Sequence, residues 1–212
     1  YLQRLYTLYI DVIKNVSSYE EILWVELDFP SITVEVDKFS SLCKKLPKQL
    51  HPWPAYKKLK QTIDDFLELQ PLIERLNDKS MRKRHWDALQ QLTGKDFKKE
   101  DDEFKLKHIL EARLLDFRVD VEEICASAKK EADIEAKLKV VANDWVKREL
   151  TFAEHNNRGF IILKGQETVE LTEALEESQM LLGGIMGSRY LEPFRDVASG
   201  WMTKLSSVTE TL

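Results

Sequence analysis

Residues 120–152, with the sequence DVEEICASAKKEADIEAKLKVVANDWVKRELTF, form the longest helical pattern in this chain. Their apolar side chains recur at helical spacing, with small drifts in phase, at Ile124, Ala128, Ile134, Leu138, Val141 and Trp145. A helix of this length would extend roughly 45–50 Å at 1.5 Å per residue. That is long for a compact globule and natural for a rod, so this stretch favours an elongated helical protein.

The segments on either side predict further helices separated by proline, glycine or charged residues. Helical patterns cover residues 1–28, 31–46, 55–77, 81–92 and 106–118, and return from about residue 171 and again after Pro193. We expect Ser31 and Ser80 to cap the helices that follow them. Pro71 should kink or split its helix, and Gly94 should end one.

The apolar period changes after Gly159. Residues 160–163 form a short apolar run, residues 164–167 suit a turn, and residues 168–171 alternate, which predicts a β-hairpin at about residues 160–171. The expected fold class is therefore mainly α, an elongated stack of antiparallel helical bundles with one small hairpin. The expected division is a helical-bundle part at residues 1–155, followed by the hairpin and further helices at residues 156–212.

Composition excludes several classes of function. The chain of 212 residues is 43% hydrophobic and 33% charged, with a net charge of −5, which argues against nucleic acid as the main partner. No apolar stretch approaches the ~18 residues of a membrane span.

Two cysteines outside any metal or redox spacing fit a reducing compartment. The chain begins without methionine and its apolar period is still running at its end, so we expect a fragment of a much longer protein.

Catalytic motifs are not found. Gly94-Lys95 suggests a phosphate-binding loop, but Leu89 and Asp96 stand where that loop needs glycine and serine or threonine. The four histidines are scattered, and adjacent carboxylates on one helix diverge rather than converge on a substrate. We therefore expect no catalytic residue, no bound cofactor and no metal in this chain.

The tryptophans are interpreted mainly as packing residues. Trp86, Trp145 and Trp201 each lie on an apolar helical stripe and are expected in the structural core. Trp53 stands between two prolines and is equally compatible with an exposed docking residue.

Several ordered blocks resemble the linker of dynein heavy chains, over roughly residues 60–212 and more weakly before. They are PLIERL at 71–76, MRKRHW at 81–86, LTG at 92–94, IEAKL at 134–138 with Trp145, LKG at 163–165, SRY at 188–190, and PF at 193–194 with Trp201. The IEAKL, Arg158-Gly159 and SRY wording is most similar to axonemal heavy chains, particularly the outer-arm gamma type.

This resemblance implies a non-catalytic mechanical role in a cilium or flagellum. The segment would be the tail-proximal half of the linker, a lever that bends against a ring of AAA+ modules, where ATP and magnesium bind. Its partners would be the ring of its own heavy chain and the other dynein chains, without direct contact to microtubules, nucleic acid or membrane. The candidate ring-contact or hinge residues are Arg82, Lys83, Arg84, Lys164, Gly165, Gln166, Glu167, Gly183, Gly184 and Gly187.

An alternative from composition alone is a scaffold or adaptor built of spectrin-like three-helix repeats. The charge and helicity suit it, whereas the predicted hairpin and the lack of self-similarity oppose it. A helical enzyme would need converging polar side chains, which the sequence does not supply.

Overall fold

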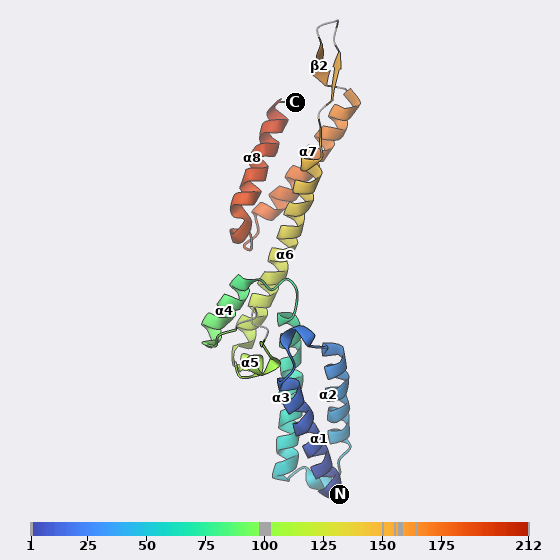
Figure 1. Ribbon diagram of the computed structural model, residues 1–212, viewed down its shortest axis with the longest axis vertical. Helices are drawn as coiled ribbons and strands as arrows, with labels where there is room; N and C mark the ends of the chain where they lie inside the picture. Colours follow the sequence, from blue (N-terminus) through green and yellow to red (C-terminus); the bar gives the residue numbers. More distant parts are fainter. Residues whose placement is uncertain are drawn as a thin grey trace. The chain divides into compact units, whose positions relative to one another are not determined.

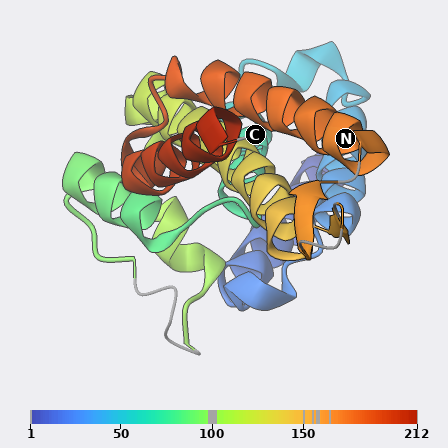
Figure 2. The same ribbon diagram turned by 90° about the horizontal axis from the view of Figure 1, so that it is seen from above.

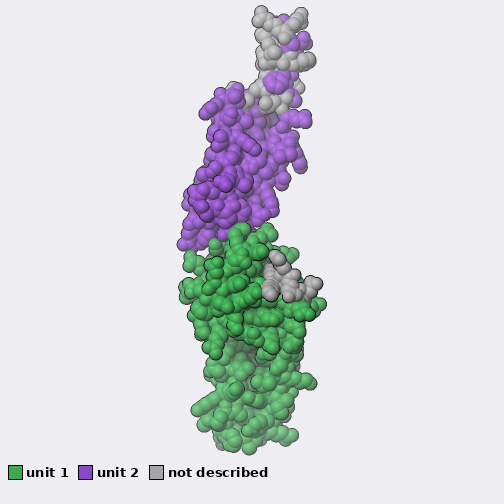
Figure 3. Space-filling view, turned by 60° about the vertical axis from the view of Figure 1, so that its left-hand side comes forward, with its two compact units in different colours: residues 1–128 green, residues 129–212 purple. Residues whose placement is uncertain are grey.

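The computed structural model describes residues 2–97, 103–149, 151–154, 156, 159–163 and 165–211, with only the backbone for residues 160–163. These residues are mainly α-helical, which confirms the predicted fold class. The chain forms two compact units, residues 1–128 and 129–212, shown green and purple in Figure 3. The sequence predicted the division at residue 155 instead. The difference arises because one long helix supplies buried residues to both hydrophobic cores.

Unit 1 begins with three helices that alternate in direction (Figure 1): α1 (Leu2–Glu20), α2 (Phe29–Lys44) and α3 (Pro54–Leu76). Two short 3-10 helices, η1 (Trp24–Glu26) and η2 (Lys48–Leu50), lie in the connections. The helices form because each has a regular apolar face; along α3 this face consists of Tyr56, Leu59, Ile63, Phe66, Leu69, Leu72, Ile73 and Leu76, all buried.

The start of α2 differs from the prediction. Asp28, not Ser31, is the capping residue, and its carboxylate accepts hydrogen bonds from the backbone N–H and hydroxyl of Ser31. Pro30 lies in the first turn, where its missing N–H costs nothing. Pro30, which separates the first two predicted helices in the sequence, therefore lies in the first turn of α2.

Pro71 does not split α3, which continues unbroken to Leu76. Proline removes one hydrogen bond and crowds the preceding turn. Here Leu69, Leu72 and Ile73 are buried on either side of it, so side-chain packing holds this end of the helix in place.

The rest of unit 1 is made of shorter elements: α4 (Lys83–Thr93), α5 (Leu106–Leu110), the 3-10 helix η3 (Leu114–Phe117) and the first part of α6 (Arg118–Val146). As predicted, α4 ends at Gly94, whose φ of 67° is left-handed. Glycine reaches this conformation without a Cβ clash. Gly94 is thus a helix stop and not part of a phosphate-binding loop.

Unit 2 contains the rest of α6, α7 (Gly165–Met186), the 3-10 helix η4 (Glu192–Phe194) and α8 (Arg195–Thr211). Figures 1 and 2 both show α7 and α8 side by side, running in opposite directions. Their shared core is formed by Ile134, Leu138, Val141, Leu171, Leu175, Leu182, Ile185, Leu191, Ala198 and Leu205.

The β-hairpin is present, but it lies earlier in the chain than predicted. Strand β2 (Phe160–Leu163) pairs antiparallel with β1 (Phe152–Glu154), joining Phe152 to Leu163 and Ala153 to Ile162. The predicted second strand, residues 168–171, is wrong, because these residues belong to α7. Leu171 begins a helical stripe with Leu175 and Leu182, and this longer period prevails over the short alternation before it.

Candidate functional site

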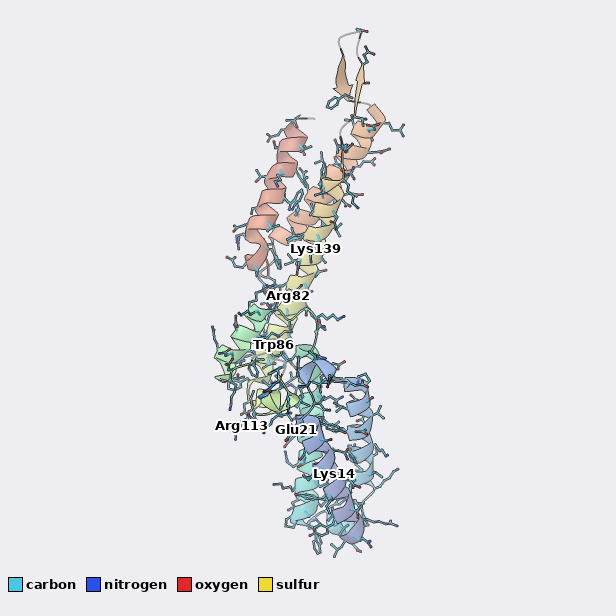
Figure 4. The ribbon with its side chains drawn as sticks, viewed as in Figure 1. Lys14, Glu21, Arg82, Trp86, Arg113 and Lys139 are labelled. Carbon is cyan, nitrogen blue, oxygen red and sulfur yellow. The ribbon has the colours of Figure 1, made fainter. Side chains whose placement is uncertain are left out.

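The basic segment Arg82-Lys83-Arg84 lies at the start of α4, with all three side chains exposed (Arg82 is labelled in Figure 4). The residues around it are anchored. Met81 is buried before it, His85 and Trp86 are buried after it, and His85 Nδ1 accepts a hydrogen bond of 3.0 Å from the Arg82 backbone N–H. The buried residues before and after the segment therefore hold its backbone in place, while its three basic side chains are exposed.

The three basic side chains lie at the N-terminus of α4, which is the end of a helix where a positive charge is unfavourable. A helix N-terminus carries a partial positive charge, and a cation there typically costs about 0.3–1 kcal/mol. Arg82 and Arg84 also have partners within the chain. The helix dipole does not account for three consecutive basic residues, and their role as a ring contact stays a prediction.

An aromatic cluster of Trp24, Trp86, Phe97, Phe104 and His108 supports this segment from inside unit 1. The Trp86 ring stands edge-on to Trp24 at a centroid distance of 5.8 Å and to Phe104 at 6.0 Å. His108 stacks on Phe104 at 5.5 Å. The cluster joins η1, α4 and α5, which are separate segments of the sequence, and Trp86 at its centre is only 4% exposed.

Backbone and charge contacts reinforce the cluster at its edge. The Trp24 N–H donates to the Phe104 carbonyl at 2.8 Å, and the Leu106 N–H donates to the Ile22 carbonyl at 3.0 Å. Glu21, labelled in Figure 4, pairs with Lys105 at 2.6 Å. The hydrogen bond from the Lys105 ammonium lowers the pKa of the Glu21 carboxyl. These contacts hold η1 against the segment before α5.

The turn predicted at residues 164–167 is not found in its described part, residues 165–167, which is helical. Lys164 lies outside the described residues, whereas Gly165, Gln166 and Glu167 form the exposed first turn of α7. Thr151 donates a hydrogen bond to the Glu167 carboxylate. A shallow hollow of about 230 Å³ lies beside this turn, lined by Arg148, Glu149, Thr151, Glu167, Thr168, Glu170 and Leu171. Its lining carries one basic and three acidic side chains.

The predicted hinge glycines lie at the far end of α7. Gly183 and Gly184 are exposed within the helix, and Gly187 follows its last residue. A methyl group at any of the three would have open space within 4 Å, apart from its own helix and chain neighbours, and none has a positive φ. Neither packing nor backbone geometry therefore requires glycine here, which leaves a hinge as a prediction to test.

The two tryptophans of unit 2 are half-buried and carry polar contacts. Trp145 Nε1 donates to Ser178 Oγ at 2.9 Å, and the Arg148 guanidinium lies 5.4 Å from the Trp145 ring. The Lys204 ammonium lies 5.1 Å from the Trp201 ring. Both rings pack against the core of unit 2 and are partly exposed.

Two general features limit the chemistry of the described part of the chain. Within it, no three His, Cys, Asp or Glu side chains gather as they would around a metal ion. None of its helices has the length and apolar character needed to cross a membrane. The features described above are instead the aromatic cluster of unit 1, the core of unit 2 and the exposed basic segment of α4.

Helix α1 has exposed apolar residues that the sequence pattern does not distinguish from buried ones. The helical pattern predicted over residues 1–28 does not separate the buried apolar residues of α1 from the exposed ones: Leu5 and Val12 are buried, whereas Leu2, Tyr6 and Ile13 are exposed. The sequence does contain a signal for this division, because these residues spread over too wide an arc of the helix to face a single neighbour.

Comparison with known proteins identifies the family. The family model described as "Dynein heavy chain, N-terminal region 2" matches residues 1–212. The chain belongs to the dynein heavy-chain family. It is 44% identical over 211 residues to human "Dynein axonemal heavy chain 8" and 44% identical over 213 residues to the Chlamydomonas reinhardtii "Dynein gamma chain, flagellar outer arm". Both matches cover 100% of this chain.

The resemblance to axonemal gamma-type chains is thereby confirmed. A beta-type relative, "Dynein beta chain, ciliary" of Tripneustes gratilla, is only 28% identical over 211 residues, again covering 100% of this chain. The chain spans only 5% of the length of each of these three relatives.

Proposed function

We propose that this segment is part of the mechanical linker of an axonemal dynein, a lever that couples ATP-driven changes in the AAA+ ring to movement of the tail. The observation that carries the proposal is the match of the whole chain to the N-terminal region of dynein heavy chains. ATP and magnesium would act in the ring of the parent motor, and the segment itself would transmit force in the axoneme of a cilium or flagellum.

The physical requirement for a lever is stiffness within each of its pieces. Each unit has a hydrophobic core of its own, and α6 extends over 29 residues without interruption. Close-packed cores resist deformation. A transition in such a protein takes place at a few compliant positions, for which Gly183, Gly184 and Gly187 are the candidates.

Contact with the ring needs a surface that can bind and release in each nucleotide cycle. The exposed Arg82-Lys83-Arg84 segment suits this because its charge is presented from an anchored backbone and is screened by water when released. The partners proposed are the ring of the same heavy chain and the other chains of the dynein complex. Direct binding to microtubules, nucleic acid or membrane is not proposed.

Energy transfer in the complete motor tests the lever function. A dye at Gly165→Cys, an exposed site with space for a side chain, and a second dye on the ring should change their distance between the ADP state and an ATP-hydrolysis transition mimic. A control pair at Gly165→Cys and Met180→Cys lies on α7, roughly 22 Å apart along the helix, and should not change. A constant dye-to-ring distance in an active motor would assign the segment a static role.

A further inference from the structure

Two threonines in the sequence have the charge pattern of a kinase substrate. An arginine precedes a serine or threonine by three positions only at Thr7, after Arg4, and at Thr151, after Arg148. Each threonine is followed by an apolar residue, leucine at position 8 and phenylalanine at position 152. Protein kinases distinguish their substrates by such charge patterns, so a kinase that selects basic residues would recognise both sequences.

The structure separates the two threonines, although both are exposed. A kinase must hold the substrate hydroxyl at its catalytic aspartate and bind the arginine elsewhere in its cleft. Three residues span about 10 Å in an extended chain but only about 4.5 Å along a helix axis. Thr7 lies within α1, so extending its surroundings would break several helical hydrogen bonds at once.

Thr151 lies in the connector between the end of α6 at Val146 and the start of β1 at Phe152. The described residues of this connector, 147–149 and 151, belong to no helix or strand, and all are exposed. Phe152 is 43% exposed, and a two-stranded hairpin such as β1 with β2 is only marginally stable by itself. The connector can therefore become extended without unfolding a helix.

Arg148 is presented to solvent from an anchored base. Its guanidinium lies 5.4 Å from the ring of Trp145, whose Nε1 donates to Ser178 Oγ at 2.9 Å. The Arg148 side chain itself is exposed. A contact between a cation and a ring is weak at an exposed site, so a kinase can take over the arginine at little cost.

We propose that Thr151 is a phosphorylation site for a serine/threonine kinase that selects arginine at the third position before its target. In this step Thr151 Oγ forms a bond to the γ-phosphorus of ATP, and the bond from that phosphorus to the β–γ bridging oxygen breaks. ADP leaves, and the hydroxyl proton passes to the catalytic aspartate of the kinase. The proposal does not depend on the lever function, because it rests on the connector alone.

The phosphoryl group would reverse the contact between Thr151 and α7. The Thr151 hydroxyl donates to the Glu167 carboxylate, whereas a phosphothreonine carries a charge of about −1.5 to −2 at pH 7 and repels that carboxylate. The hollow beside Thr151 is lined by Glu149, Glu167 and Glu170 and by one cation, Arg148. The N-terminus of α7 adds the equivalent of about half a positive charge, which with Arg148 does not offset three carboxylates. Phosphorylation therefore releases the connector from the first turn of α7.

Phosphorylation of the complete heavy chain tests the site, with Thr7 as the matched control. The kinase is the catalytic domain of a calcium/calmodulin-dependent protein kinase, and mass spectrometry assigns the phosphate to each threonine. Thr151 should react at least tenfold faster than Thr7. Peptides of residues 1–13 and 145–157, each with its threonine in the seventh position, should react at rates within threefold of each other. Equal rates in the heavy chain, or the same tenfold preference in the peptides, would overturn the proposal.

Variants of the connector test how the site is recognised. Arg148→Gln in the heavy chain should slow phosphorylation of Thr151 at least tenfold and leave the rate at Thr7 unchanged. Lys147→Gln removes the same charge one position earlier and should slow it less than threefold. Equal losses in the two variants, or no loss in Arg148→Gln, would refute recognition through the arginine.

Hydrogen exchange tests the structural consequence. After phosphorylation, the amides of β1 (Phe152–Glu154) should exchange at least threefold faster, while those around Ala198 in the core of unit 2 should not change. Thr151→Val removes the hydrogen bond without adding charge and should give a smaller increase. Glu167→Gln should reduce the increase caused by the phosphate, because it removes the nearest repulsion. Unchanged exchange in β1 after complete phosphorylation would refute the release.

Discussion

Replacing Trp86 by alanine removes the centre of the aromatic cluster in unit 1. The ring is 4% exposed and contacts Trp24, Phe97 and Phe104 at centroid distances of 5.8, 5.9 and 6.0 Å. Truncating a buried tryptophan to alanine costs about 3–5 kcal/mol, because transfer energy is lost and a cavity remains. Small domains have only about 5–15 kcal/mol of stability in total, so Trp86→Ala should remove a large part of it.

The assay is urea unfolding of the 212-residue segment followed by far-UV circular dichroism. With an m value of about 2 kcal/mol/M, the midpoint for unit 1 should fall by roughly 1.5–2.5 M. Because the two units have separate cores, a resolved transition of unit 2 should move little. Trp53→Ala is the matched control, since Trp53 is 42% exposed and its truncation should cost about 0.5 kcal/mol. Equal costs for the two variants would refute the packing argument.

Three further predictions follow from local contacts. Gly183→Ala and Gly184→Ala should each raise the free energy of unfolding of unit 2 by about 0.5–1 kcal/mol, because both positions are helical, exposed and sterically open. Calorimetry checks this, and a loss of stability would reveal strain. Ser178→Ala should cost about 0.5–1.5 kcal/mol in urea unfolding, because it removes the acceptor for Trp145; no loss would mean that the bond contributes nothing. Burial and a hydrogen bond to a carboxylate on α2 raise the pKa of Tyr19, so its contribution is complete below pH ~10 and lost as pH rises further. Urea midpoints at pH 8 and 11 should fall more in the wild type than in Tyr19→Phe, and parallel falls would contradict the reasoning.

The glycine variants also bear on the lever proposal. If Gly183 and Gly184 supply compliance, the stabilised variants should slow microtubule gliding by the complete motor while ATP still binds. Unchanged gliding with increased stability would show that α7 does not bend there. The same pair of substitutions thus separates a stability role from a mechanical one.

The helical pattern of the sequence predicted most of the fold. The helical spacing of Ile134, Leu138 and Val141 along α6 can be recognised without knowing which distant residues they contact, because the helix period is a local property. Gly94 was likewise predictable as a helix stop from its own chemistry. The capping residue of α2 was not, because Asp28 and Ser31 have similar propensities and only the path of the chain decides between them.

The hairpin shows where local patterns are insufficient. The alternation at residues 168–171 suits a strand, but Leu171 is buried in the core of unit 2 together with Leu175 and Leu182, so α7 includes these residues. Strand β2 pairs instead with residues before it. Pairing is a non-local property, so a short strand can be recognised in the sequence while its partner cannot.

The sequence by itself determined the family, the helical class and the predicted basic segment at residues 82–84, because these depend on residue identity, order and period. Only the tertiary structure decided which apolar residues are covered. It gathered Trp24, Trp86 and Phe104 from three separate segments into one cluster, and it divided the apolar residues of α1 into a buried and an exposed face. Burial depends on which surfaces meet in space, and no local property of the chain contains that information.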